Sequence, residues 1–191
     1  MIIRPPRSNY QPIPDGAASA IQDREGNAVM RKEVHLKSRT GTKLVGAFLT
    51  CPGNPGGRPC VIYMHGNASN KSEGEEYAKD LVMLGIDLFC FDFSGCGNSG
   101  GDFVTLGWKE TEDLLGVLDF LKEQGLTSKV GLWGRSMGAA TALMTDASKS
   151  PLPIGALVLD SAFSDLSVLI KEMAGGMGIP PDLAQMLLPM L

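Results

Sequence analysis

The sequence VGLWGRSMG, residues 130–138, joins a short apolar run to a serine that is flanked by glycines. Val130–Trp133 predicts a buried strand, and Ser136–Ala147 predicts the helix that follows it. The pentapeptide GRSMG at their junction matches the G-x-S-x-G nucleophile elbow, in the strand–turn–helix context that this motif requires. Small flanking residues let strand and helix approach each other, and a helix N-terminus behind the serine favours an oxyanion. We therefore expect the Ser136 hydroxyl to project above the edge of a sheet as a nucleophile; a glycine-rich turn that merely contains a serine is the structural alternative.

Further apolar runs without polar alternation predict strands that are covered on both faces, as in a parallel sheet. They are Cys60–Met64, Ile86–Phe91 and Ile154–Leu159. Helical patterns separate these runs, at Glu73–Leu84 before Gly85 and around Leu114–Leu121 before Gly125. Upstream, two shorter strand patterns flank turn residues and predict an antiparallel hairpin: Val34–Leu36, Ser38–Gly41 and Leu44–Leu49.

The alternation of strands and helices predicts an α/β fold with a mostly parallel twisted sheet, helices on both faces and the hairpin at its N-terminal side. Residues 1–30 predict an extended arm, because prolines at positions 5, 6, 12 and 14 disfavour helix. Within this arm, Arg4-Pro5-Pro6-Arg7 is expected to be a plain surface segment, with a polyproline ligand as the alternative. Residues 31–191 predict one domain.

Composition restricts the class of protein. The 191 residues carry a net charge of −4 with an isoelectric point near 5.2, so nucleic acid is not an expected partner. Neither a membrane span nor a signal peptide is visible, and we expect a soluble, cytoplasmic protein. The four cysteines form no C-x-x-C pair and are expected to be reduced and buried. With only His35 and His65 beside them, no metal site or other cofactor is expected.

Gly95-Cys96-Gly97-Asn98-Ser99-Gly100 is a literal G-x-G-x-x-G pattern that follows a predicted strand. In a dinucleotide-binding fold a helix begins at once and contains the third glycine. Here Gly101–Val104 continue the loop, and the next helix is predicted to start only near Gly107. A dinucleotide-binding oxidoreductase is therefore a remote alternative.

Several motifs together resemble the serine aminopeptidase-like branch of the α/β-hydrolase superfamily. They are Arg4–Arg7, His65-Gly66-Asn67, Asp92–Ser99, Leu106-Gly107-Trp108, Gly131–Gly138 and Val158–Leu166. The resemblance implies Ser136 as the nucleophile and the backbone N–H groups of Asn67 and Met137 as the oxyanion hole. It implies hydrolysis of an ester, thioester or amide with a small-molecule, acyl or peptidyl substrate. His65 precedes the serine, against the Ser–acid–His order of this fold, so a structural role in its loop is expected.

The chain departs from the family pattern after the proposed nucleophile. No histidine follows Ser136, and Asp160 is expected to be structural rather than the acid. We expect a hydrolase fold without its last strands, C-terminally truncated relative to the family and inactive alone. A non-catalytic α/β-hydrolase-like binding module is the alternative. The open sheet edge and the apolar tail at residues 179–191 are expected to cause self-association.

Overall fold

A computed structural model describes residues 4, 6–11, 14–22, 26, 28–51 and 57–176. The strands in this part of the chain are β1 (Gly16–Gln22), β2 (Ala28–Lys37), β3 (Lys43–Thr50), β4 (Cys60–Met64), β5 (Asp87–Phe91), β6 (Val130–Arg135) and β7 (Ile154–Asp160). The helices are α1 (Ser72–Glu75), α2 (Ala78–Met83), α3 (Glu110–Glu123), α4 (Met137–Met144) and α5 (Leu166–Gly176), with a single 3₁₀ turn at Ala147–Lys149.

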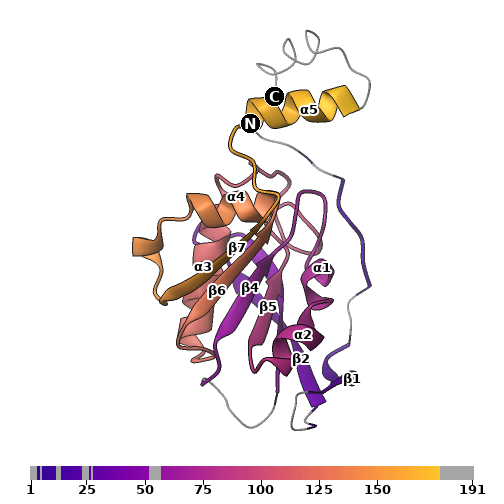
Figure 1. The fold of residues 1–191 in the computed structure, drawn as a ribbon, viewed down its shortest axis with the longest axis vertical. Coiled ribbons are helices and arrows are strands. Elements are labelled where there is room, and N and C mark those ends of the chain that lie inside the picture. Colours follow the sequence, from indigo (N-terminus) through magenta and orange to yellow (C-terminus); the bar gives the residue numbers. More distant parts are fainter. Residues whose placement is uncertain are drawn as a thin grey trace.

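The strands form one mixed sheet, in which the described order is β1-β2-β3-β5-β4-β6-β7 (Figure 1). Strands β5, β4, β6 and β7 run parallel, whereas β1, β2 and β3 are antiparallel to their neighbours. The predicted fold class is confirmed. The antiparallel part is larger than the predicted hairpin, because β1 adds a third strand and β2 begins at Ala28.

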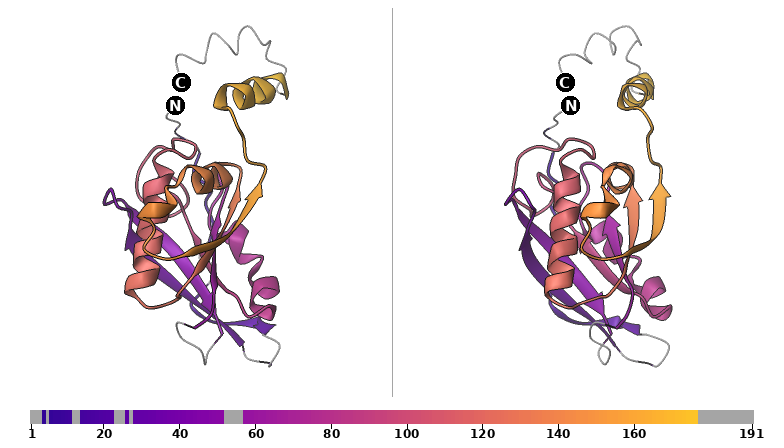
Figure 2. Two further views of the ribbon diagram at one scale, coloured as in Figure 1. Left: turned by 60° about the vertical axis from the view of Figure 1, so that its left-hand side comes forward. Right: turned by 90° about the vertical axis from the view of Figure 1, so that its left-hand side faces the viewer.

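Side chains of the central strands alternate between two cores. Ile62 and Met64 of β4 pack with Leu114 and Leu118 of α3 on one face. Tyr63 of β4 packs with apolar residues of α2 on the other face. Helices therefore cover both faces, with α3 and α4 on one side and α1 and α2 on the other (Figures 1 and 2).

Parallel register brings the carboxyl ends of the central strands to one edge. Met64 lies opposite both Phe91 and Gly134, and Arg135 lies opposite Asp160. The loops that leave β4, β5, β6 and β7 consequently meet at this edge. It is the place where an open α/β sheet presents ligands and catalytic groups.

Three boundaries differ from the sequence prediction. The arm predicted over residues 1–30 contains β1 and the first residues of β2, because these strands pair with the sheet. The helix predicted at Glu73–Leu84 is split into α1 and α2, and the helix predicted to end at Ala147 ends at Met144. The apolar tail that we expected to promote self-association lies outside the described residues.

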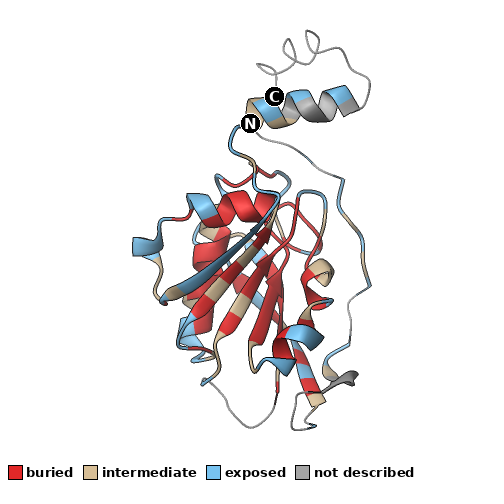
Figure 3. Cartoon of the chain, in the orientation of Figure 1, coloured by how far each residue is buried: buried red, intermediate tan, exposed pale blue. Residues whose placement is uncertain are grey.

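The last strand of the sheet is poorly covered. Leu157 and Val158 of β7 are 51% and 50% exposed, and the burial colouring shows β7 exposed beside the buried central strands (Figure 3). Helix α5 stands away from the sheet beyond its carboxyl edge in all the ribbon views (Figures 1 and 2). In the described part of the chain, no strand pairs with the outer edge of β7.

All four cysteines are buried and outside any disulfide, as predicted. Cys60 and Cys90 lie within β4 and β5, where burial raises the pKa of each thiol. A raised pKa keeps a thiol protonated and unreactive. The cysteines therefore serve as small core residues.

Candidate active site

Ser136 lies in the turn between β6 and α4, at the carboxyl edge of the sheet. Its backbone has φ 51° and ψ −108°, a left-handed φ that a serine rarely adopts. The Ser136 N–H donates to the Asp160 carbonyl oxygen at 2.8 Å, and the Ser136 carbonyl accepts from the Ala140 N–H at 3.0 Å. The backbone conformation is thus held by hydrogen bonds from both sides, and strain that is held in this way is typical of functional turns.

The two glycines of the G-x-S-x-G pattern allow very close backbone approach. A Cβ atom at Gly134 would lie 2.3 Å from the carbonyl of Gly138. A Cβ atom at Gly138 would lie 2.1 Å from the carbonyl oxygen of Met64. Any side chain at either position would push α4 away from β6 and β4, so the turn requires glycine twice.

The predicted oxyanion donors lie in neighbouring loops at the same edge. Asn67 is exposed in the turn that follows β4, and Met137 is the buried first residue of α4. Because Met64 is opposite Gly134 in the parallel register, the chain leaves β4 beside the elbow. The fold therefore brings the loop of Asn67 and the N-terminus of α4 to adjacent strand ends.

His65 is fully buried and has both ring nitrogens engaged. Its Nδ1 donates to the Gly66 carbonyl oxygen at 2.7 Å, and its Nε2 accepts from the Phe93 N–H at 3.2 Å. Burial lowers the pKa of the ring, which favours the neutral form. His65 thus ties the loop after β4 to the loop after β5, and it has no nitrogen left to act as a base.

An ion pair beside the serine was missed by the sequence analysis. Arg135 donates from Nε and Nη2 to the carboxylate of Glu73 at 2.5 and 2.6 Å. Glu73 also accepts from Tyr63 at 2.6 Å and from Ser69 at 2.5 Å. Although burial by itself would raise it, these hydrogen bonds lower the pKa of Glu73 to about 2. The pair joins the elbow to α1. Its one signal in the sequence is the arginine at the variable position before Ser136 in G-x-S-x-G.

The guanidinium of Arg135 also packs on the loop after β4. A Cβ atom at Gly66 would lie 2.9 Å from Nη2 of Arg135. Glycine at this position therefore makes room for the guanidinium, and the Arg135–Glu73 pair holds the loop of Asn67 against the elbow.

The glycine-rich loop after β5 binds a carboxylate of this chain, that of Asp92. The buried carboxylate of Asp92 accepts from the N–H groups of Asn98 and Lys71 at 2.9 and 2.6 Å. A Cβ atom at Gly97 would lie 2.4 Å from this carboxylate. The first helix after the loop begins at Glu110. The Asn98 amide of this loop therefore binds Asp92, and the amides of Gly95, Ser99 and Gly100 donate to backbone carbonyl groups.

Among the described residues, neither a histidine nor a carboxylate forms a hydrogen bond with the Ser136 hydroxyl. Asp160 ends β7, and its carboxylate accepts from the Ser161 hydroxyl at 2.8 Å. His35 is exposed on β2 and lies 3.7 Å from Glu33. In the described ranges the Ser136 hydroxyl has no hydrogen-bond partner, and no cluster of three or more potential metal ligands is present.

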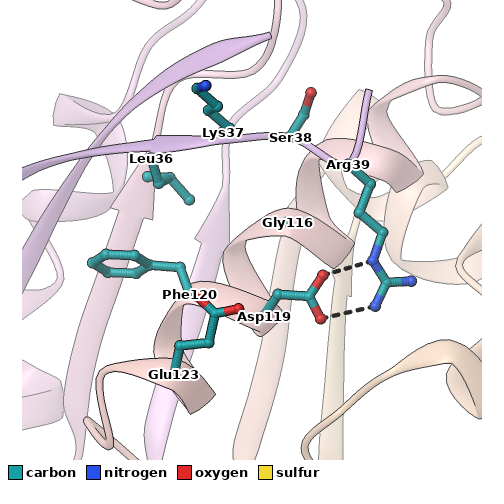
Figure 4. A pocket seen from close by; sticks show the side chains of 8 residues that line it. All are labelled: Leu36, Lys37, Ser38, Arg39, Gly116, Asp119, Phe120 and Glu123. Carbon is teal, nitrogen blue, oxygen red and sulfur yellow. Dashed lines mark hydrogen bonds and ion pairs between the residues drawn. The ribbon is translucent and has the colours of Figure 1, made fainter. Parts of the chain in front are cut away.

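Two pockets lie away from the elbow. One, of about 330 Å³, is formed by the β2–β3 turn and α3 (Figure 4). There Arg39 donates two hydrogen bonds of 2.7 and 2.8 Å to the Asp119 carboxylate. The other, of about 260 Å³, includes Trp108 and Met144. Ser136 lines neither pocket, so both are separate from the candidate active site.

A serine in a left-handed strand-to-helix turn, at the carboxyl edge of a mixed sheet with helices on both faces, is typical of the α/β-hydrolase class. The fold is that of an α/β-hydrolase. The chain belongs to the family described as "Serine aminopeptidase, S33", whose family model matches residues 57–189.

Curated relatives are 26–30% identical to this chain over the aligned residues. The uncharacterized protein YfhR of Escherichia coli is 27% identical over 150 residues, which are 77% of this chain and 52% of YfhR. Protein bem46 of Schizosaccharomyces pombe is 26% identical over 161 residues, which are 83% of this chain and 53% of bem46. Lysophosphatidylserine lipase ABHD12 of Danio rerio is 30% identical over 112 residues, covering 56% of this chain and 29% of the lipase. The chain thus spans about half the length of the bacterial and yeast relatives.

Solved structures support the same fold. The Pyrococcus furiosus esterase Pf2001 superposes with a TM-score of 0.71 at 24% identity, over 99% of this chain and 67% of the esterase. Est1E of Butyrivibrio proteoclasticus superposes with a TM-score of 0.60 at 24% identity, over 75% of this chain and 56% of Est1E. Among the described residues, no helix has the length and apolar character needed to cross a membrane.

Proposed function

We propose that this chain carries the nucleophile and the oxyanion hole of a serine hydrolase that acts on an ester, thioester or amide. The proposal rests chiefly on the left-handed backbone of Ser136 at the junction of β6 and α4. Membership of the serine aminopeptidase family supports it. The zebrafish relative named as a lysophosphatidylserine lipase adds weight to an ester substrate.

In the proposed reaction, Ser136 Oγ attacks the substrate carbonyl carbon and passes its proton to a base. The carbonyl oxygen becomes an oxyanion, which the N–H groups of Asn67 and Met137 stabilise. Collapse breaks the bond to the alcohol, thiol or amine, which leaves with the proton from the base. Water then attacks the acyl-enzyme, and the acid product and the free Ser136 hydroxyl are restored.

A base must be supplied from outside the described residues in this mechanism, because both ring nitrogens of His65 are engaged and His35 lies on β2. In serine proteases, loss of the histidine lowers kcat by about six orders of magnitude. We therefore propose that residues 1–191 alone hydrolyse activated esters no faster than their Ser136→Ala variant.

Fluorophosphonate labelling tests the assignment of the nucleophile. In a version of the protein lengthened beyond Leu191 by a segment that supplies a base, we expect the reagent to label Ser136 and Ser136→Ala to abolish the label. Ser161→Ala is the matched control, since Ser161 also follows a strand with a left-handed φ of 55°. Labelling that persists in Ser136→Ala contradicts the proposal.

A non-catalytic binding module is the second candidate, favoured by the lack of a hydrogen-bond partner for the Ser136 hydroxyl among the described residues. It predicts that the lengthened protein resists the fluorophosphonate. It also predicts that the wild type and the Ser136→Ala variant turn over p-nitrophenyl acetate at the same rate in both lengths of the protein. Turnover that depends on Ser136 in the lengthened protein excludes it.

A further inference from the structure

Several N–H groups of the loop at residues 95–101 donate to acceptors within the loop or in the fold beneath it. The N–H of Gly95 donates to the Gly100 carbonyl at 2.7 Å, and the N–H of Gly100 donates to the Lys43 carbonyl at 2.8 Å. The N–H of Asn98 donates to the buried Asp92 carboxylate at 2.9 Å. With these donors satisfied from inside the fold, the outer surface of the loop presents acceptors.

Four carbonyl groups of this loop converge on one side chain of the N-terminal arm. Nη1 of Arg7 donates to the carbonyl oxygens of Cys96, Gly97 and Ser99 at 3.3, 2.9 and 2.6 Å. Nη2 of Arg7 donates to the carbonyl oxygen of Gly101. Across the described ranges, no carboxylate forms an ion pair with Arg7. Within the described part of the chain, the guanidinium is therefore held by backbone acceptors alone.

The shape of the loop depends on its glycines. Gly95, Gly97 and Gly101 have φ values of 80°, 45° and 81°, which other residues rarely adopt. A Cβ atom at Gly95 would lie 2.7 Å from the Phe103 carbonyl oxygen. The first two glycines of the G-x-G-x-x-G pattern, together with Gly101, thus set the shape of the acceptor site.

We propose that residues 96–101 form a guanidinium-binding site made of backbone carbonyl groups, occupied by Arg7 of the same chain. The polarity is opposite to that of a phosphate-binding loop, in which outward N–H groups hold an anion. A planar guanidinium spreads five N–H donors and can address several separated acceptors at once, whereas an ammonium group donates from a single nitrogen. The site therefore selects arginine over lysine.

Occupation of this site anchors the arm over a buried charge cluster. Three residues beyond Arg7, the hydroxyl of Tyr10 donates to the Asp92 carboxylate at 2.7 Å. The buried Lys71 Nζ lies 4.3 Å from the centre of the Tyr10 ring and 3.5 Å from the Glu33 carboxylate. The Asn70 amide donates to the Ser8 hydroxyl at 2.9 Å. Arg7 thus fixes the start of the segment that covers Lys71.

Chemical rescue of Arg7→Ala tests the proposal without any activity measurement, so its outcome is independent of the proposed hydrolase function. Charge-assisted hydrogen bonds stabilise a fold enough that their loss in a chain of this size lowers the Tm by about 4 °C. We expect this fall in Arg7→Ala, and we expect millimolar methylguanidinium to reverse it with saturation, as ligand linkage requires. Methylammonium should not reverse it.

Arg4→Ala is the matched control, because Arg4 is exposed in the same arm and makes no hydrogen bond or ion pair with the described residues. We expect its Tm to stay at the wild-type value, and wild-type protein to gain nothing from methylguanidinium. Arg7→Lys should lose nearly as much as Arg7→Ala. If Arg7→Ala is insoluble, methylguanidinium should restore its refolding yield. An unchanged Tm in Arg7→Ala, an equal effect of methylammonium, or no rescue of Tm or yield overturns the proposal.

Discussion

Backbone strain in this protein is concentrated at single residues along one edge of the sheet. Ala68, Leu106, Ser136 and Ser161 are the non-glycine residues with positive φ in the described ranges, with values between 51° and 57°. Each of them lies in the loop that leaves a different parallel strand. Such conformations cost about 1–3 kcal/mol each and persist where the surrounding structure holds them. The carboxyl edge is therefore the strained edge of the molecule.

Only part of this residue-scale geometry was predictable. The G-x-S-x-G spacing predicts a sharp turn at Ser136, because glycine on both sides permits close approach. Nothing local marks Ala68 or Leu106, since both side chains disfavour positive φ. At Leu106 the N–H groups of the two neighbouring residues, Thr105 and Gly107, donate to the Glu110 carboxylate. The pair Arg135–Glu73 was missed because its partners are 62 positions apart.

At the start of β5, Asp87 predicts a pH dependence of stability. Its side chain is 1% exposed, and its Oδ1 atom has no hydrogen-bond partner in the described part of the chain. Burial raises its pKa to about 6, against about 3.9 in an unfolded chain. The stability it contributes is therefore complete below the unfolded pKa and is lost as the pH rises through the folded pKa.

We expect Asp87→Asn to be close to neutral at low pH and to raise the free energy of unfolding by about 2 kcal/mol at pH 8, because the neutral amide is never ionised in the core. Urea denaturation between about pH 4 and pH 8 measures this difference. Asp80→Asn, at an exposed carboxylate of α2, is the control. Asp113, whose pKa burial raises to about 7, leaves a residual slope in every variant. Parallel pH profiles for wild type and Asp87→Asn would contradict the prediction.

At the scale of elements, the strands were more predictable than the helices. The prediction for β4 is confirmed at both ends, and that for β5 is wrong by one residue. Buried parallel strands are short and continuous in hydrophobicity, so one apolar run marks each strand. Helix Glu73–Leu84 was predicted from local pattern alone. In the structure Glu73 pairs with Arg135 and Glu75 with Arg31, and these tertiary contacts accompany a break between α1 and α2.

The ion pair between Glu73 of α1 and Arg135 of the elbow predicts the effect of Glu73→Gln. Loss of charge-assisted hydrogen bonds at a partly exposed pair should lower the free energy of unfolding by about 1–2 kcal/mol. Amide hydrogen exchange at residues 65–70 should become faster, because the loop loses its anchor. Since the folded pKa of Glu73 is about 2 and thus below its unfolded value, the loss should be constant above about pH 5.

Glu76→Gln is the control for this prediction, since Glu76 is an exposed carboxylate just after α1. It should leave both the stability and the exchange at residues 65–70 unchanged. Equal exchange in Glu73→Gln and Glu76→Gln would show that the loop does not depend on the pair.

Across the whole molecule, burial falls off toward one side of the sheet. The central strands are covered on both faces, whereas Leu157, Val158 and Leu159 of β7 are 51%, 50% and 37% exposed. An exposed apolar strand whose outer edge pairs with no other described strand is a template for pairing with another chain. We propose that the protein self-associates through β7.

Light scattering during size-exclusion chromatography tests this proposal. We expect the mean mass to rise with protein concentration, and Val158→Lys to shift it toward the monomer by placing a charge on the edge. Val168→Lys is the matched control, because Val168 of α5 is 49% exposed. A monomeric mass at every concentration, or the same shift in both variants, would rule out β7 as the contact.

The strand order also determines which strand edge is unpaired at each stage of synthesis. By the time Phe91 has left the ribosome, β1, β2, β3, β5 and β4 are all available, and β4 already stands at the end of this partial sheet. Its remaining edge must wait for β6, which is completed about 44 residues later. At translation rates of about 5–20 residues per second, that delay is about 2–9 s. A strand that lies inside the finished sheet is therefore, for those seconds, the exposed edge of a nascent chain and the natural point for a chaperone to engage.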